Sequence, residues 1–206
     1  ETGATVHGAV ADLVTDAGRS ALLAACPEPD ILVNNNAGPP PGQLADWDYE
    51  AWIAALEANL LTGALLLRAV LPGMRSRRWG RIVNITSAMV KTPHAAMGLS
   101  TAARAGLTAL SRALAREAAP DNVTLNNLLP ERIDTPRQEF MAQRMMKASG
   151  ISRDEARAQI AATIPAGRMG RPEEFGAACA FLCSELAGYI SGQNLQLDGG
   201  AYAGLV

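Results

Sequence analysis

Short apolar runs that alternate with longer stretches rich in alanine and leucine constrain the fold of this chain more than any other feature. Ile31-Leu32-Val33 and Ile82-Val83-Asn84-Ile85 are two such runs, and polar residues do not alternate with apolar ones in them. A strand of this kind is buried on both faces, as in a parallel sheet covered by helices. Strand runs that alternate with helical stretches predict an α/β architecture with crossover helices. We therefore expect a doubly wound parallel sheet within one domain.

The pattern also predicts where the elements lie. We expect strands over residues 4–10, 30–34, 80–86, 122–128 and 194–197, and helices over 16–25, 47–76, 98–118 and 172–184. The helix over 47–76 is expected to break near Leu71-Pro72-Gly73, and residues 129–170 are expected to be less regular. Ligands of such sheets bind beyond the carboxyl ends of the strands. The segments to consider for a site are therefore 34–38, 86–87 and 130–135.

Charge and composition exclude several functions. The formal net charge of −2 gives no basic surface for nucleic acid or for an acidic membrane. No unbroken apolar run reaches the roughly 18 residues of a membrane span. With two histidines and three cysteines, neither a zinc site nor a disulfide framework is expected. Cys179 and Cys183 fit free thiols in a reducing compartment, so we expect a cytoplasmic protein with no metal, nucleic acid or membrane partner.

Six segments follow one another in a recognisable order. They are Asp30-Ile-Leu-Val-Asn-Asn35 with Asn36, Ala37 and Gly38 after it; Glu57-Ala-Asn59-Leu60; Asn84-Ile-Thr-Ser87; Pro130-Glu-Arg-Ile-Asp-Thr135; Gly170-Arg-Pro-Glu-Glu174; and Ser191–Gly200. Together they resemble the short-chain dehydrogenase/reductase family, in particular its 3-oxoacyl-carrier-protein reductase branch, along essentially the whole chain. The resemblance implies a Rossmann-type sheet and a nicotinamide cofactor, NADP or NAD.

The resemblance also implies which residues contact that dinucleotide. Asp12 stands where the family contacts the adenine, and Arg104 can hold the ribose hydroxyls. The segments around the nicotinamide supply the other expected contacts, which are Asn35, Asn36, Ala37, Gly38, Pro130, Ile133 and Thr135. Glu131 replaces the glycine that the family carries after the proline.

The front of the family's fold is missing from this sequence. The glycine-rich turn Thr-Gly-x-x-x-Gly-x-Gly is absent, and residues 4–10 correspond to the family's third strand. The chain therefore lacks the first two βα units, about 50 residues by the size of such units. We expect the natural protein to be longer. Without those units the strand over 30–34 becomes an unpaired apolar edge.

The catalytic positions are fixed by spacing. In the family, a serine ends the fifth strand, a tyrosine follows thirteen residues later, and a lysine four residues after that. Counted from Ser87, these positions hold Ser100 and Arg104. Asn59 occupies the place of the family's asparagine in the long helix. Asn59, Ser87, Ser100 and Arg104 are therefore the expected catalytic set, with the family's proton donor replaced.

A serine hydroxyl donates a hydrogen bond but is a far weaker acid than a tyrosine, and an arginine stays charged and cannot relay a proton. His94, in the loop between Ser87 and Ser100, is the candidate replacement acid, and Lys91 lies in the same loop. A solvated loop position is the plain alternative for both. Tyr49, Tyr189 and Tyr202 are expected to be remote.

Two further segments border the expected site. Residues 134–165 correspond to a mobile lid over the substrate, and Met141, Met145 and Met146 form either an oily wall of that lid or a stripe facing the core. Pro39-Pro-Pro-Gly42 either shapes the entrance or is a rigid turn. Because the helices over 47–76 and 98–118 pair across a two-fold axis in the family, a homodimer or homotetramer is expected.

Three functions remain open. The first is an oxidoreductase with an altered proton donor that transfers hydride between a nicotinamide dinucleotide and a small-molecule carbonyl or alcohol; the resemblance implies a 3-oxoacyl-like substrate. The second is a non-catalytic dinucleotide-binding or partner subunit of the same fold. The third is a cofactor-free relative similar to the halohydrin dehalogenases, which Arg104 fits but the missing tyrosine does not.

Overall fold

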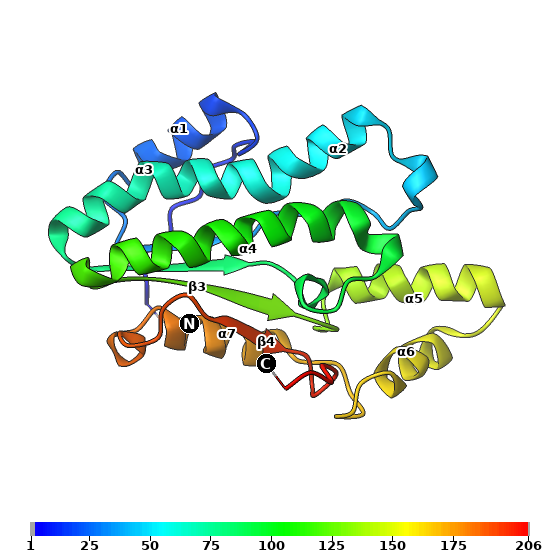
Figure 1. Cartoon of the computed structure of the whole chain (residues 1–206). Helices are drawn as coiled ribbons and strands as arrows, with labels where there is room; N and C mark the ends of the chain where they lie inside the picture. The colour runs from blue at the N-terminus through cyan, green and yellow to red at the C-terminus, as the bar shows by residue number, and fades with distance from the viewer. Residues whose placement is uncertain (1–2, 206) are drawn as a thin grey trace.

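The computed structural model describes residues 3–205 and contains one parallel sheet (Figure 1). Its strands lie side by side in the order of the sequence and all run in the same direction. They are β1 (Ile31–Asn34), β2 (Gly80–Ile85), β3 (Val123–Pro130) and β4 (Asn194–Leu197). The expected α/β sheet is therefore confirmed, and β2 and β3 are buried along almost their whole length.

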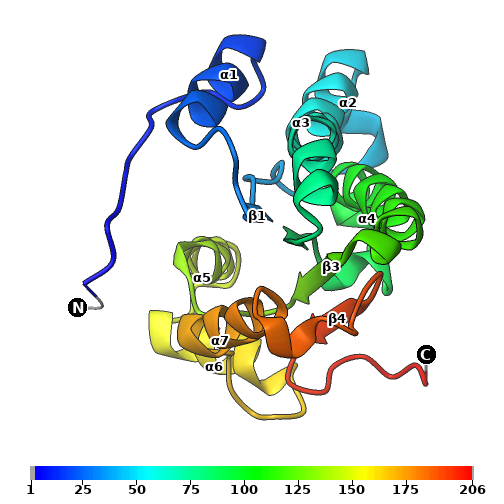
Figure 2. The same ribbon diagram turned by 90° about the vertical axis from the view of Figure 1, so that its left-hand side faces the viewer.

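Helices cover both faces of this sheet. Figure 2 shows α3 and α4 on one face and α7 on the other, with α5 and α6 on the same side as α7. The helices are α1 (Asp16–Ala25), α2 (Tyr49–Leu56), α3 (Thr62–Arg77), α4 (Gly98–Ala118), α5 (Pro136–Ser149), α6 (Arg153–Ala162) and α7 (Pro172–Leu182). This layering makes the sheet doubly wound, as expected.

Each face of the sheet has its own apolar core. Leu67 and Met74 of α3 pack with Ile82 and Leu125 of the sheet, and Leu23 of α1 packs against the same cluster. On the other face Leu182 of α7 packs with sheet residues. Burying a side chain of this size stabilises the fold by about 1.5–3 kcal/mol, so the helices are held mainly by these contacts.

A row of asparagines crosses the sheet at a single register. Asn34 is aligned with Asn84, Asn84 with Asn127, and Asn127 with Asn194. Asn34 Nδ2 donates to Asn84 Oδ1 at 2.7 Å, Asn84 Nδ2 to Asn127 Oδ1 at 3.2 Å, and Asn127 Nδ2 to Asn194 Oδ1 at 2.8 Å. We call these four residues the asparagine ladder. A register slip between any two strands would break it.

The expected strand over residues 4–10 was wrong. No strand forms there, and Val6 and Val10 are 86% and 108% exposed. Within residues 3–205 no further strand lies beyond β1 to pair with this segment, so an extended backbone there gains no ladder hydrogen bonds. The expected apolar edge is confirmed, since Ile31 and Val33 of β1 are 45% and 42% exposed.

The break that we expected in the long helix near Pro72 does not occur. Pro72 lies inside α3, which continues to Arg77, and the buried Leu71 and Met74 hold it against the core. The irregular turn lies elsewhere, at Glu57–Leu61, where the helix between α2 and α3 is π-helical. Turns of this kind occur often at functional sites.

The segment expected to be less regular, 129–170, contains two helices and the end of β3, so that expectation was wrong. Ion pairs stabilise this arrangement, Arg153 with Glu139 and Arg157 with Asp134, each at 2.7 Å. Met141, Met145 and Met146 pack against buried residues of α5 and α6, which favours the core-facing stripe over the oily wall.

The helical stretch Tyr49–Arg77 has the length of a membrane span and contains an 18-residue window with a mean hydropathy of 1.5. As expected, it contains no unbroken apolar run of about 18 residues, because polar and charged residues interrupt it. The core helix of a folded domain meets the same criterion, and α3 buries Leu67, Val70 and Met74. Length and composition alone therefore do not place this helix in a membrane.

Candidate active site

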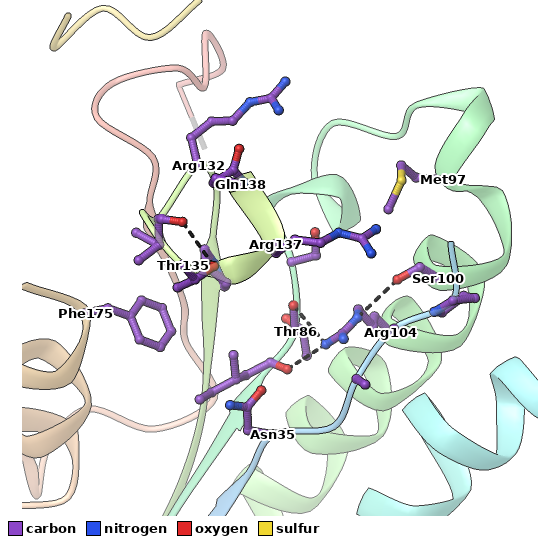
Figure 3. A pocket seen from close by; sticks show the side chains of 17 residues that line it. Asn35, Thr86, Met97, Ser100, Arg104, Arg132, Thr135, Arg137, Gln138 and Phe175 are labelled. Carbon is purple, nitrogen blue, oxygen red and sulfur yellow. Dashed lines mark hydrogen bonds between the residues drawn. The ribbon is translucent and has the colours of Figure 1, made fainter. Parts of the chain in front are cut away.

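A pocket of about 540 Å³ lies at the carboxyl ends of the strands (Figure 3). Segments that follow β1, β2 and β3 meet there with the start of α4, the start of α5 and one side chain of α7. The lining residues are Asn35, Ala37, Gly38, Pro39, Ile85, Thr86, Ser87, Met97, Ser100, Arg104, Pro130, Arg132, Ile133, Thr135, Arg137, Gln138 and Phe175. Its place in the sheet is the one at which α/β folds bind ligands.

Arg104 anchors the pocket to the strand ends. Its Nη1 donates to the carbonyl oxygens of Ile85 at 2.8 Å and Thr86 at 3.0 Å, and its Nη2 donates to the carbonyl oxygen of Asn36 at 3.0 Å. Its Nε donates to Ser100 Oγ at 3.2 Å. Four of the five guanidinium donors are thus used within the protein, so Arg104 has little left for ribose hydroxyls.

Ser100 and Ser87 face the same pocket from different elements. Ser100 belongs to the first turn of α4, is 7% exposed, and accepts a hydrogen bond from Arg104. Its own proton is free to be donated to a ligand. Ser87 follows β2, and its Oγ accepts from the Met89 amide at 3.2 Å. Both hydroxyl-bearing residues therefore line one pocket.

Asn59 connects the π-helical turn to the loop after β1. Its Nδ2 donates to the carbonyl oxygen of Ala37 at 2.8 Å, and Asn36 Nδ2 donates back to the carbonyl oxygen of Ala58 at 2.9 Å. A β carbon on Gly38 would lie 3.3 Å from Ser100 Oγ and 3.3 Å from Arg104 Nη2. The close approach explains why a glycine stands at this position.

Most of the residues expected from the sequence come together here. Asn35, Ala37, Gly38, Ser87, Ser100, Arg104, Pro130, Ile133 and Thr135 line the pocket. Asn36 and Asn59 line a small adjoining cavity behind Arg104 and Ile85. Asp12 does not line the pocket, and its carboxylate accepts from the Val14 amide before α1.

The loop candidates for the proton donor lie outside the pocket lining. His94 is exposed, and its Nδ1 accepts from the Ala96 amide at 3.3 Å. Lys91 Nζ lies 5.0 Å from the centre of the Tyr202 ring. Tyr202 therefore lies next to this loop, but like Tyr49 and Tyr189 it is not among the residues that line the pocket.

Sequence reasoning missed several lining residues, above all Arg137 and Gln138, and it gave no role to Arg132 although this residue lies in the expected segment 130–135. Three buried polar atoms of the lining, Thr86 Oγ1, Arg132 Nε and Gln138 Oε1, have no hydrogen-bond partner. Unsatisfied buried groups of this kind suit a site that a polar ligand completes. Arg132 has a φ of 53°, a left-handed conformation unusual for a residue other than glycine, and nothing in the residue type signalled it.

The pocket is electropositive. Its lining includes Arg104, Arg132 and Arg137. No acidic residue of the described part of the chain lines it. Burial, and after it the neighbouring charge of Arg137, lowers the pKa of Arg104 to about 10. Arg104 thus stays protonated at neutral pH, but with no carboxylate beside it.

Comparisons with known proteins agree with this architecture. A family model described as enoyl-(acyl carrier protein) reductase matches residues 11–202. A 3-oxoacyl-[acyl-carrier-protein] reductase from Vibrio cholerae is 38% identical over 173 residues, which are 84% of this chain and 66% of that protein. An NADPH-dependent reductase from Bacillus subtilis is 34% identical over 85% of this chain and 68% of its own length. The chain thus spans about two thirds of the length of these curated relatives.

Solved structures show the same fold. An NADPH-dependent reductase involved in bacilysin biosynthesis superposes with a TM-score of 0.87 at 30% identity, over 94% of this chain and 76% of that one. L-sorbose reductase from Gluconobacter frateurii, solved with NADPH and L-sorbose, has a TM-score of 0.88 at 29% identity, over 95% and 76%.

Proposed function

The chain belongs to the short-chain dehydrogenase/reductase family, and from this premise we propose that it is part of an NAD(P)-dependent oxidoreductase that acts on a small-molecule carbonyl or alcohol. The observation that carries the proposal is the convergence of Ser87, Ser100 and Arg104 on one pocket at the strand ends. The relatives named as NADPH-dependent reductases favour NADPH, and those named as 3-oxoacyl reductases favour a 3-oxoacyl-like substrate.

The pocket residues fit the nicotinamide end of such a cofactor. Ile85, Ile133 and Phe175 give it apolar walls, while the unpaired Thr86 Oγ1 and Gln138 Oε1 suit a carboxamide. Asn35, Ala37, Gly38, Pro130 and Thr135 complete the proposed contacts. When bound, the dinucleotide supplies the hydride, with its electron pair, that reduces the carbonyl carbon.

The chain's own residues would hold the substrate oxygen. As the carbon accepts hydride, the carbonyl π pair moves to the oxygen, where the hydroxyls of Ser87 and Ser100 donate hydrogen bonds to the growing negative charge. Arg104 keeps Ser100 in place through its Nε–H and adds positive charge. Asn59 acts as a positioning residue for the Ala37–Gly38 backbone. The proton that completes the alcohol comes from solvent, since neither hydroxyl is acidic enough to give one up.

Turnover measures this proposal directly. NADPH oxidation, followed by its fluorescence, should be seen with a panel of ketones that includes a 3-oxoacyl thioester, and Ser100→Ala should slow it by about tenfold or more, as the loss of one oxyanion donor does. Arg116→Gln, a change at the far end of α4, serves as the matched control. No turnover of any panel member would contradict the proposal.

A second candidate is a non-catalytic dinucleotide-binding or partner subunit. The observation that favours it is the pair Ser100 and Arg104 at the positions where the family carries tyrosine and lysine. Dinucleotide that raises the melting temperature while no ketone is turned over would support this alternative over the first.

We further propose a cytoplasmic homodimer or homotetramer. An apolar groove between α3 and α4, lined in part by Leu67, Leu71, Leu110 and Leu114, supports pairing of these helices with a second copy. The three cysteines are free, which suits a reducing compartment. Light scattering of the purified chain measures the assembly, and a monomer at all concentrations would exclude it. A substrate lid over 134–165 stays a prediction.

A further inference from the structure

We propose that the substrate of this pocket carries an anionic group, a carboxylate or a phosphate, and that Arg137 binds it. The inference deepens the proposed function, because it concerns the ligand of the same site. It assigns a specificity-determining role to a residue of α5 that the spacing of the catalytic positions does not involve.

The first step is charge balance. Arg104, Arg132 and Arg137 come from three separate elements, α4, the segment after β3 and the first turn of α5. None of them forms an ion pair with a carboxylate within residues 3–205. Arg137 lies close enough to Arg104 for its charge to lower the pKa of the buried guanidinium. Like charges gathered in a partly enclosed site are unfavourable until an anion joins them.

The second step is to identify which guanidinium is free. Arg104 has committed four donors to the protein. The Arg132 side chain also has no partner among the described residues, but in Figure 3 it extends away from Met97 and Ser100. The Arg137 side chain forms no hydrogen bond to any described residue, and its guanidinium carbon lies 5.7 Å from the centre of the Phe140 ring. Its planar fork of donors is therefore available, and such a fork matches the two oxygens of a carboxylate or phosphate.

The third step concerns direction. Figure 3 shows the Arg137 side chain extending from α5 toward Met97 and Ser100, on the side of the pocket opposite Phe175. A group bound by Arg137 would thus be attached to the molecule whose oxygen meets Ser100. The phosphates of a dinucleotide offer the same chemistry, so the experiment must separate a substrate anion from a cofactor phosphate.

Binding of two matched probes tests the proposal without requiring turnover. Acetoacetate and methyl acetoacetate share the ketone but differ in charge, and their affinities are measured by titration calorimetry on the whole chain, with and without saturating NADP+. The wild type should bind acetoacetate roughly ten- to a hundredfold more tightly than the ester, as expected for a charge-assisted pair. Arg137→Gln should bring that ratio close to one, and Arg137→Lys should keep part of it.

Arg144→Gln is the matched control. Arg144 lies on the same helix, and its guanidinium also approaches the Phe140 ring, at 6.0 Å, but it does not line the pocket. This variant should retain the full acid-to-ester ratio. Because Arg137 is exposed, its substitution should not unfold the chain.

Several outcomes would overturn the proposal. They are undetectable binding of acetoacetate, equal affinity of the wild type for acid and ester, or a ratio that Arg137→Gln leaves unchanged. If Arg137→Gln instead weakens NADP+ while the ratio stays constant, the anion is a cofactor phosphate and the proposal fails. A high ratio without hydride transfer to any ketone would overturn the proposed function but not the anion site.

Discussion

Replacing Asn84 by leucine should destabilise the fold more than any other change to the asparagine ladder. Asn84 is fully buried and makes three side-chain hydrogen bonds, with Asn34, Ser111 and Asn127. In Asn84→Leu, Asn34 Nδ2 and Asn127 Oδ1 lose this partner, whereas Ser111 Oγ still donates to the Leu107 carbonyl oxygen.

The magnitude follows from these contacts. Each buried group left without a partner raises the free energy of the folded state by about 2 kcal/mol, or about 4 kcal/mol for the pair. Burial of the leucine side chain stabilises the folded state by about 1.5 kcal/mol. The unfolding free energy should therefore fall by about 2.5 kcal/mol. Asn194→Leu, at the half-buried end of the ladder, removes one bond, and water can replace it there, so this control should lose only about 1 kcal/mol.

Urea denaturation followed by tryptophan fluorescence measures both changes, provided that the slope with urea concentration is the same for all three proteins. A loss below about 0.5 kcal/mol for Asn84→Leu, or a loss equal to that of Asn194→Leu, would refute the reasoning, since the amides would then contribute no coupled stability. The outcome also bears on the site, because Asn34 and Asn84 immediately precede Asn35 and Ile85, which line the pocket.

Three further predictions concern the site and the surface. Ser100→Tyr combined with Arg104→Lys should increase ketone reduction, measured as NADPH oxidation, because it restores a proton donor and its lysine; no increase would show that the rest of the site has also changed. His94→Ala should retain turnover at neutral pH, because the imidazole is exposed and lies outside the pocket lining; loss of turnover would restore His94 as the acid. The hydrogen bond from the Arg168 side chain, and after it the one from the Arg171 amide, holds the pKa of Glu174 at about 2, below the value in the unfolded chain. The contribution of ionised Glu174 to stability is therefore fully present above about pH 4.3 and is lost as the pH falls toward 2. In Glu174→Gln the urea midpoint should therefore change less between about pH 4.3 and 2 than in the wild type. The same pH dependence in both proteins would contradict this role of Glu174.

The sequence predicted the elements whose signal is local. The apolar runs of β2 and β3 and the capped helices α1 and α7 follow from patterns within a few residues, and their bounds differ from the expected ones by at most two residues. The strand expected over 4–10 does not form because a strand needs a neighbouring strand for its hydrogen bonds. The local sequence does not show whether such a neighbour is present. The course of α3 through Pro72 was missed for a related reason, since packing against the core outweighs the proline.

The residues of the site also fall into those that the sequence could place and those that it could not. Ser87, Ser100 and Arg104 could be placed by counting, because a strand end and a helix face fix their positions relative to each other. Arg132, Arg137 and the position of Tyr202 depend on how α5 and the C-terminal segment return to the sheet. Sequence spacing does not predict where these segments lie in the fold. The positive charge of the pocket could therefore be recognised only from the three-dimensional structure.

Arg104 shows why the two substitutions in the catalytic set act as a pair. A lysine at this position would be a flexible point charge with three donors, free to turn toward a ligand. The arginine instead binds the carbonyl oxygens of Ile85, Thr86 and Asn36, and its Nε–H holds the small Ser100. Ser100 is packed closely on this side, since a β carbon on Gly38 would lie 3.3 Å from Ser100 Oγ. Serine and arginine therefore fit each other in this pocket. Their combination removes the family's proton donor and leaves a guanidinium that is fixed to the strand ends by four hydrogen bonds.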